Sequence, residues 1–323
     1  EWNSGEDLPV LLTDQDTNLN SKNDEDIKVS DPRFVIIPTM KIGTPRTLND
    51  GGFANITTVP AIAGFAAAPL ADQFSGILRA STTVAQALPA GGSGVNLNVT
   101  FANPPGDFDP GTTHSKRVYL NYDIRSLQNS TGTAPFVISA TNKTIEATGS
   151  FVGSVPLAPS TNDYQQLVDV TPFANSLAGP NVGGTDPLHI SFNFTLATAH
   201  TLPIGTYPIA VDVFSFGTTG DGNLPSERFN NAIYRFELEE TGDNTGQFAG
   251  TIQYIMLNQL NVNQTSTYTL GIKPIDNDVQ IIVGEDLTDE DSPRINYLYH
   301  HPDVFCHSDV KAGLCLLAFR DVE

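Results

Sequence analysis

The clearest pattern of hydrophobic and polar positions lies in residues 233–258. Apolar and charged side chains alternate through its first half, in the order Tyr234, Arg235, Phe236, Glu237, Leu238 and Glu239. A period of two residues is that of a β-strand with one buried face and one solvent-exposed face. The apolar residues are therefore predicted to face the core, and the three charged residues to face water.

A glycine-rich turn, residues 241–246, follows that strand. Gly242 and Gly246 adopt a positive φ at little cost, and the Asp and Asn side chains between them can bond their own backbone. Alternation resumes in residues 248–256, except at Gly250, where we expect a bulge or a close approach of another backbone. The pattern predicts a long β-hairpin. Because an isolated hairpin is marginally stable in water, other strands must cover its apolar face.

Further strand-like runs recur along the chain with turn residues between them. They cover residues 8–12, 34–37, 40–42, 95–101, 118–124, 136–140, 144–152, 189–200 and 209–216. The last run is apolar on both faces, which is typical of a central strand covered on both sides. Runs at these intervals predict an all-β fold of one or two β-sandwiches. Residues 43–94 are instead rich in Ala, Gly and Pro, which indicates an insertion or an interdomain segment, and a short helix can form between Ala71 and Leu88.

Composition narrows the class of protein. The 323 residues include 36 acidic and 16 basic ones, which gives a formal net charge of −20, yet only 16% of residues are charged. The polar remainder is Asn, Thr, Ser and Gly, a composition that indicates an extracellular protein. A surface this negative repels nucleic acids and anionic membranes and attracts cations. We expect no nucleic-acid partner, and the longest weakly polar run, residues 60–71, is too short to cross a bilayer.

Two acidic clusters are candidate calcium sites. The first alternates oxygen-bearing side chains after the first predicted strand, and the second lies near the C-terminus; their residues are Asp14, Asp16, Asn18 and Asn20, and Asp286, Asp289, Glu290 and Asp291. Hard oxygen ligands at alternate positions suit Ca²⁺, and Glu25 stands twelfth from Asp14, as in an EF-hand. Leu19, however, replaces the glycine that an EF-hand needs, so we predict a calcium-binding β-loop. For the first loop taken alone, a solvated turn whose Asx side chains bond their own backbone is the favoured alternative.

The sequence contains none of the enzyme motifs that we sought: no Gly-rich phosphate loop, no HExxH and no GxSxG. Glu239 and Glu240 are adjacent on a strand and should face opposite sides, which argues against a shared acid–base site. We therefore predict that the chain is not an enzyme. A glycoside hydrolase on a β-sandwich is the alternative, because residues that converge only in the fold leave no motif.

Sequons for N-glycosylation, Asn-x-Ser/Thr, occur at Asn55, Asn98, Asn129, Asn142, Asn193 and Asn263. Their use depends on secretion, and a chain rich in Thr and Asn also produces such matches by chance. The two cysteines, Cys306 and Cys315, are candidates for a disulfide. With His300, His301 and His307 they also offer zinc ligands, although without the spacing of a zinc finger. The default interpretation is that these cysteines and histidines are free or poorly ordered and form neither a disulfide nor a metal site.

Four long stretches of the chain resemble the surface-layer proteins of ammonia-oxidising archaea. They read SGEDLPVLLTDQDTNLN, NDEDIKVSDPRFVIIPTMKIGTP, NNAIYRFELEETGDNTGQFAGTIQYIMLNQLN and EDLTDEDSPRINYL, in this order along the chain. The resemblance reaches to about Tyr297 and is strongest in the last third. Residues 298–323 depart from the acidic, cysteine-free pattern of that family. The family's members are much longer, which implies a fragment, a processed piece or a shorter relative.

This resemblance implies immunoglobulin-like β-sandwiches and a large insertion. We expect one such sandwich from residues 1–42 and 206–297, an inserted or second β-domain in residues 43–205, and a divergent tail. It also implies a porous, acidic lattice outside the cell, built by self-association with divalent cations, that protects the cell and favours passage of cations, ammonium among them. The alternative is an adhesin or filament subunit that assembles by β-strand addition.

Overall fold

In the computed structural model the regular secondary structure of the described residues is almost entirely β-strand. The structure describes residues 7–34, 37–42, 46–47, 55–59, 66–69, 80–84, 95–100, 117–128, 136–141, 155–156, 161, 163–170, 189–194, 205–218, 228–230, 232–256, 275–276, 278–283, 296–297 and 315–316. The helical elements whose bounds the structure describes are two short 3-10 turns, η1 (Gln15–Thr17) and η3 (Arg125–Leu127). The strands form four sheets, which we name A to D.

Sheet A contains the predicted hairpin. Its strand order is β1 (Asp7–Thr13), β18 (Gln247–Met256), β17 (Leu238–Glu240) and β2 (Asp26–Ile27), and β20 (Asp278–Val283) pairs with β18 in parallel. The alternation in β1 is regular, since Leu8, Val10 and Leu12 are buried and the residues between them are exposed. One face of β1 therefore packs on the core and the other meets solvent.

Sheet B contains the N-terminal half of the first strand of the predicted hairpin, and sheet A contains the C-terminal half. The order of sheet B is β19 (Ile275–Asp276), β16 (Ala232–Phe236), β3 (Thr39–Ile42), β21 (Asn296–Tyr297) and β22 (Cys315–Leu316). The chain leaves sheet B at Phe236 and enters sheet A at Leu238, so the predicted strand is divided between two sheets. This division explains why one prediction was wrong. Arg235 was expected to face water, but it is fully buried, together with Tyr234 and Phe236.

Sheets C and D are built from the middle of the chain. Sheet C has the order β12 (Gln165–Asp169), β9 (Arg117–Asp123), β14 (Gly205–Thr218), β7 (Ala80–Val84) and β6 (Ala66–Pro69), and β15 (Arg228–Asn230) and β4 (Arg46–Thr47) also pair with β14. Sheet D has the order β11 (Val155–Pro156), β10 (Phe136–Thr141), β13 (His189–Phe194), β8 (Val95–Thr100) and β5 (Asn55–Val59).

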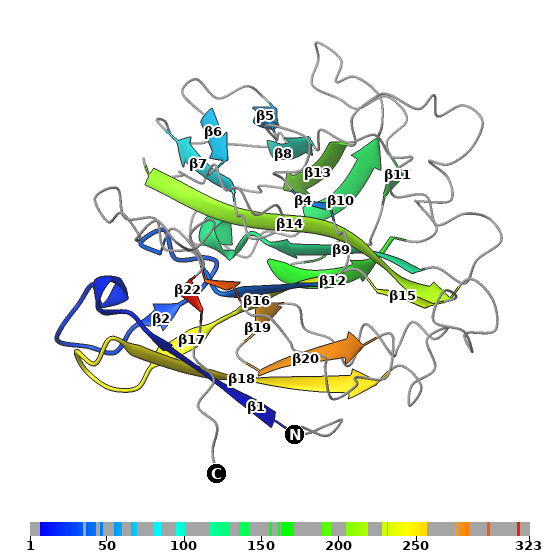
Figure 1. Cartoon of the computed structure of the whole chain (residues 1–323). Coiled ribbons are helices and arrows are strands. Elements are labelled where there is room, and N and C mark those ends of the chain that lie inside the picture. The colour runs from blue at the N-terminus through cyan, green and yellow to red at the C-terminus, as the bar shows by residue number, and fades with distance from the viewer. Residues whose placement is uncertain are drawn as a thin grey trace, which may run out of the picture.

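The sheets are stacked in layers. Figure 1 shows sheet D above β14 and β9 of sheet C, β16 of sheet B below them, and sheet A at the bottom. Aromatic side chains lie between sheets C and D: the ring of Tyr122 of β9 lies 5.3 Å from that of Phe192 of β13, and within sheet D the ring of Phe136 lies 5.0 Å from that of Phe194, centroid to centroid. Tilted and edge-on contacts of this kind add stabilisation beyond the burial of the rings.

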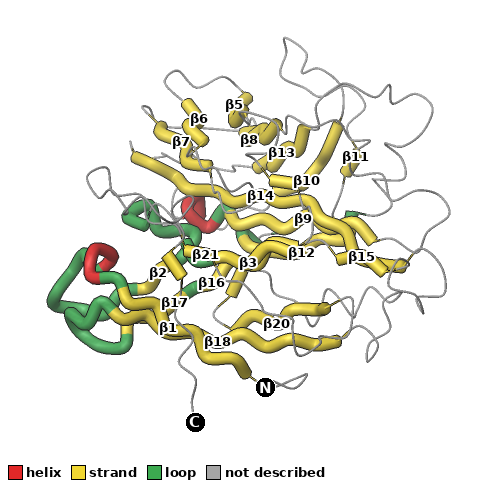
Figure 2. Tube along the Cα trace, in the orientation of Figure 1, coloured by secondary structure: helices red, strands yellow, loops and turns green. Residues whose placement is uncertain are grey.

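Several strand predictions are confirmed. The runs at 8–12, 95–101, 118–124 and 136–140 correspond to β1, β8, β9 and β10, and the described part of the run at 189–200 is β13 (Figure 2). The strand at 209–216 is β14, whose described side chains are all buried, as expected of a central strand. Gly250 forms no bulge, because it stands in unbroken register opposite Val10. Of residues 71–88, 80–84 form β7 instead of a helix, and the run at 144–152 lies outside the described residues.

The sheets draw their strands from different parts of the sequence. Sheets A and B use residues 7–42 and 232–316, whereas sheets C and D use residues 46–230. β14 begins at Gly205 and pairs with β9, so the change between the two groups of sheets falls after Asn230. The assignment of an immunoglobulin-like domain with an insertion from residue 43 to 205 stays a prediction.

Candidate functional site: the acidic loops at the end of sheet A

The two stretches that the sequence singles out, the Asp14–Asn20 segment and the hairpin turn, lie against each other. The backbone N–H of Asp14 donates to the carbonyl of Gly246 over 2.9 Å, and Nε2 of Gln15 donates to the carbonyl of Thr245 over 2.6 Å. Nδ2 of Asn18 donates to Oδ1 of Asn244 over 3.0 Å. The first acidic loop is therefore held by the turn between β17 and β18. We refer to residues 14–26 and 239–247 together as the acidic end.

The side chains of two of the four predicted ligands in this loop, Asp14 and Asn20, hold the loop itself. Oδ1 of Asp14 accepts from the N–H of Asp16 over 3.0 Å and caps η1, and Oδ1 of Asn20 accepts from the N–H of Lys22. These are the local Asx bonds of the alternative interpretation. Oδ1 of Asn18 is different: it is buried and accepts no hydrogen bond from the described residues. It is an oxygen that a cation could use.

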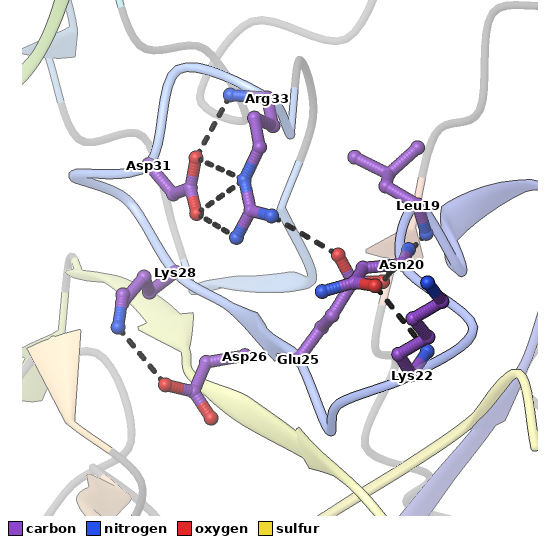
Figure 3. Close-up of polar contacts among 8 residues, drawn as sticks. All are labelled: Leu19, Asn20, Lys22, Glu25, Asp26, Lys28, Asp31 and Arg33. Carbon is purple, nitrogen blue, oxygen red and sulfur yellow. Dashed lines mark hydrogen bonds and ion pairs between the residues drawn. The ribbon is translucent and has the colours of Figure 1, made fainter. Parts of the chain in front are cut away.

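Glu25 organises the other half of the loop (Figure 3). Its carboxylate is almost fully buried; Oε2 accepts from the backbone N–H groups of Leu19 and Asn20 over 2.5 and 3.1 Å. Oε1 accepts from Arg33 over 3.1 Å, and Arg33 also forms a two-pronged pair with Asp31. A carboxylate with these partners supports the loop, in agreement with the sequence argument against an EF-hand, in which Glu25 would be the twelfth ligand.

The pKa values of the neighbouring carboxyls follow from these partners. Burial by itself would raise the pKa of Asp31, but the hydrogen bonds and charge of Arg33 outweigh it and lower the pKa. The pKa of Asp24 is raised, chiefly by a hydrogen bond with the Asp243 carboxyl, and the charges of Glu240 and Glu239 act in the same direction. The acidic end therefore brings like charges from the loop and the hairpin close together.

Glu239 and Glu240 face opposite sides of β17, as predicted. Glu239 is exposed, and Glu240 is buried. Oε1 of Glu240 accepts from the N–H groups of Thr245 and Gly246, both over 2.8 Å, so this carboxylate supports the turn from inside. Such an arrangement gives the pair no shared solvent-facing position for acid–base chemistry.

No group of three or more His, Cys, Asp or Glu side chains is arranged for a metal ion in the described part of the chain. The second acidic cluster, Asp286 to Asp291, lies outside that part, as do Asn129, Asn142, Asn263 and Cys306. Asn193 is exposed on β13, while Asn55, Asn98 and Cys315 are described only as members of strands. The metal, glycosylation and disulfide assignments stay predictions.

Buried ion pairs join the sheets, and sequence analysis missed them. Arg235 of β16 contacts both carboxylate oxygens of Asp212 on β14, and both side chains are fully buried. Asn121 of β9 donates to the same carboxylate over 3.3 Å. One signal was present in the sequence: Asp212 interrupts the apolar strand 209–216, and a charge inside such a strand needs a buried partner.

A second ion pair bridges the same layers. Arg125, directly after β9, contacts Asp123 over 2.7 Å and also pairs with Glu237, the residue between β16 and β17. Burial opposes the charged form of the guanidinium, but the two carboxylates outweigh that cost and raise its pKa. The point where the chain passes from sheet B to sheet A is therefore fixed to sheet C.

Gly246 is required by the contact between loop and turn. Its φ is +60°, and an added Cβ would lie 2.5 Å from the end of the Gln15 side chain. Gly246→Ala is expected to destabilise the protein by about 1–2 kcal/mol, mainly because an L-residue in this conformation is strained. Urea unfolding measures it. Adding Gln15→Ala to Gly246→Ala should remove the clash with the Gln15 side chain but not the backbone strain. A double variant as stable as the Gln15→Ala single variant would show that the backbone at position 246 is not strained.

Comparisons with known proteins add no family. No protein-family model matches the chain, and no curated protein does. Among solved structures, the enzymatically active domain of tailspike protein 4 from bacteriophage CBA120 gives a weak match, with 12% identity and a TM-score of 0.21. The match covers 50% of this chain and 19% of that one. At this level of similarity it bears on neither fold nor function. No described helix has the length and apolarity of a membrane span.

Proposed function

We propose that this chain is a structural protein of the cell envelope, a self-associating subunit of a porous, acidic surface layer outside the cell. The observation that carries the proposal is the position of the stretches that resemble such proteins. They span residues 4–20, 23–45, 230–261 and 285–298. Their described parts supply β1, β2, β3, β16, β17, β18 and β21, which are most of sheets A and B. Stretches far apart in the sequence thus contribute to one part of the fold.

The finer architecture of this proposal is an immunoglobulin-like sandwich formed by sheets A and B. Two features support it: the sheets share the chain segment that runs through β16 and β17, and the buried face of β1 is regular. Sheets C and D then belong to the inserted part of the chain. An all-β subunit with small, mostly antiparallel sheets suits a role in which rigid modules tile a surface.

The distribution of charge supports a layer that favours cations. Every arginine with a described side chain, namely Arg33, Arg125 and Arg235, pairs with carboxylates of the same chain. Carboxylates such as Asp7, Asp16 and Asp243 are exposed. Pores lined by such subunits enrich small cations within a Debye length, about 8 Å at physiological salt. Ammonium is enriched in this way without a dedicated pocket, and sodium competes on the same terms.

Calcium at the acidic loops is part of the proposal. It is supported by the buried, unpaired Oδ1 of Asn18 among the described groups and by the like charges that Asp24 and Asp243 bring together. A divalent cation relieves such repulsion within one subunit or between neighbours. The extracellular location, the sequons and the Cys306–Cys315 disulfide belong to the same proposal.

Electron microscopy of the purified chain, with calcium and then with excess chelator, tests this function. We expect two-dimensional sheets with calcium, and loss of order and a lower melting temperature after chelation. Magnesium at equal ionic strength is the control for screening by divalent charge. Absence of sheets under all conditions would contradict the lattice, and unchanged sheets and melting temperature in chelator would contradict the role of calcium.

A second candidate, an adhesin or filament subunit, is favoured by one observation: within the described residues β1 pairs on one side only, with β18. Such an edge accepts an added strand. Threads instead of sheets in the same images would select this candidate.

A further inference from the structure

The outer edge of β1 can be read from one hydrogen bond. The N–H of Asp14 donates to the carbonyl of Gly246, and the register of β1 against β18 continues from that pair through Leu12 opposite Phe248. In an antiparallel ladder, residues that exchange hydrogen bonds with the neighbouring strand alternate with residues that do not. The backbone groups of Leu8, Val10 and Leu12 therefore face β18. Those of Asp7, Pro9, Leu11 and Thr13 point the opposite way.

Pro9 fits this assignment. A proline has no N–H, so it is tolerated where the missing donor would point away from the sheet. The outward donors of β1 are then the N–H groups of Asp7, Leu11 and Thr13, and all four outward residues offer a carbonyl. Each of these residues is exposed, and Leu11 keeps 49% of its surface accessible, although it is a large hydrophobic residue in mid-strand.

The surface beside this edge carries no charge over several positions. Pro9, Leu11 and Thr13 are uncharged, and so are Ala249 and Gln247, the β18 partners of Leu11 and Thr13 on the same face. Two copies of a chain with a net charge of −20 repel each other over most of their surface. A neutral face, beside backbone groups that have no partner among the described residues, repels a second copy less than the acidic end does, whereas a strongly cationic partner would prefer the acidic end.

We propose that β1 pairs with β1 of a second copy, antiparallel and around a two-fold axis. With Pro9 opposite Leu11 of the second copy, and Asp7 opposite its Thr13, every outward N–H of both strands meets a carbonyl. Moving the pairing by one step of the ladder, to Leu11 opposite Leu11 or to Pro9 opposite Pro9, leaves an outward donor of each strand beyond the end of the partner strand. The donors and the single proline thus select one register.

This contact joins the two copies of sheet A into one continuous sheet. A two-fold contact uses the same surface on both copies and closes on itself, so it makes a dimer and no filament. The inference deepens the proposed function, on which its place in a layer rests, by naming one of the contacts that a lattice needs. The dimer itself is independent of that function and can be measured in solution.

Sedimentation of the full chain over a wide range of concentration tests the dimer, at raised salt to screen the net charge. Leu11→Pro removes an outward N–H from each strand and leaves the bonds to β18 intact. We expect it to weaken dimerisation by at least about tenfold. Leu11→Glu should also weaken it, whereas Gln247→Glu, which adds the same charge one strand inward, should weaken it less. Unfolding midpoints show that each variant is folded.

The register is tested by a cross-link. Asp7→Cys with Thr13→Cys, in a chain where Cys306 and Cys315 are serine, places the two thiols opposite each other across the proposed axis. Cα atoms of a hydrogen-bonded pair are about 5.5 Å apart, which suits a disulfide. Mild oxidation should give a covalent dimer, and Asp7→Cys alone should not.

The outcomes separate this inference from the proposed function. A monomer at every concentration and salt, or a dimer insensitive to Leu11→Pro, overturns the β1 contact. If Leu11→Pro is monomeric but electron microscopy still shows sheets, the layer stands and the contact is wrong as a lattice contact. If the β1 dimer forms and no sheets do, the contact stands and the lattice fails.

Discussion

Replacing Arg235 by methionine is expected to destabilise the folded protein by about 3–5 kcal/mol. The guanidinium and the Asp212 carboxylate are both fully buried, so Arg235→Met removes the guanidinium that pairs with a carboxylate in the interior, although Asn121 still donates to it. Methionine has a similar length and keeps most of the packing. Chemical unfolding of the single variant against the unmodified chain measures the effect.

Two further variants make this result specific. Arg235→Met combined with Asp212→Leu removes both charges and should recover most of the lost stability, because an apolar pair replaces a buried ion pair at little cost. Lys28→Met removes a partner from the exposed Lys28–Asp26 pair and should change stability by less than about 1 kcal/mol. A single Arg235 variant as stable as the Lys28 variant would show that the buried pair is dispensable.

Replacing Glu25 by alanine is expected to cost about 2–4 kcal/mol, because the carboxylate accepts charge-assisted hydrogen bonds from Leu19, Asn20 and Arg33. The amide protons of Leu19 and Asn20 should then exchange faster with solvent, whereas those of β18 should change little. Unfolding and hydrogen exchange measure these two effects.

Glu25→Gln is the matched control for Glu25→Ala. Its amide oxygen still accepts from the backbone N–H groups, but it has no charge for Arg33, so an intermediate loss of stability is expected. If Glu25→Ala were as stable as the unmodified chain, the hydrogen bonds that Glu25 accepts would not hold the loop. If alanine and glutamine cost the same, the Arg33 charge would carry the whole effect and the loop bonds none.

The strands that sequence analysis identified are those whose pattern is local. In β1 and β9 the residue types and the alternating faces of a strand are sufficient to predict that a strand forms. The turn at Gly246 follows from a conformation that glycine adopts readily. The acidic loop was also located correctly as an irregular segment after β1. What local pattern could not give is the partner of each strand, because pairing joins residues such as Leu8 and Ile252 across most of the chain.

Arg235 and Glu25 show why the sequence did not predict the roles of these charged residues. Alternation assigns Arg235 to a wet face only if one sheet contains the whole strand, and the passage from sheet B to sheet A at Glu237 removes that condition. Glu25 stands at the twelfth position of an EF-hand-like spacing, but it was not among the predicted ligands, and the spacing did not indicate that its carboxylate binds two backbone N–H groups and an arginine. In both cases a partner that the local pattern does not identify decides the role of the charge.

The passage of one chain segment from sheet B into sheet A also determines how the protein resists stretching. A pull along β16 and β17 acts parallel to both strands, so it shears the hydrogen bonds to β3 in one sheet and those to β18 in the other at the same time. The pair between Arg125 and Glu237 lies at the junction and shares that load with sheet C. Peeling the sheets open one bond at a time would need a pull in another direction. Mechanical strength is therefore anisotropic, greatest along the direction of this segment.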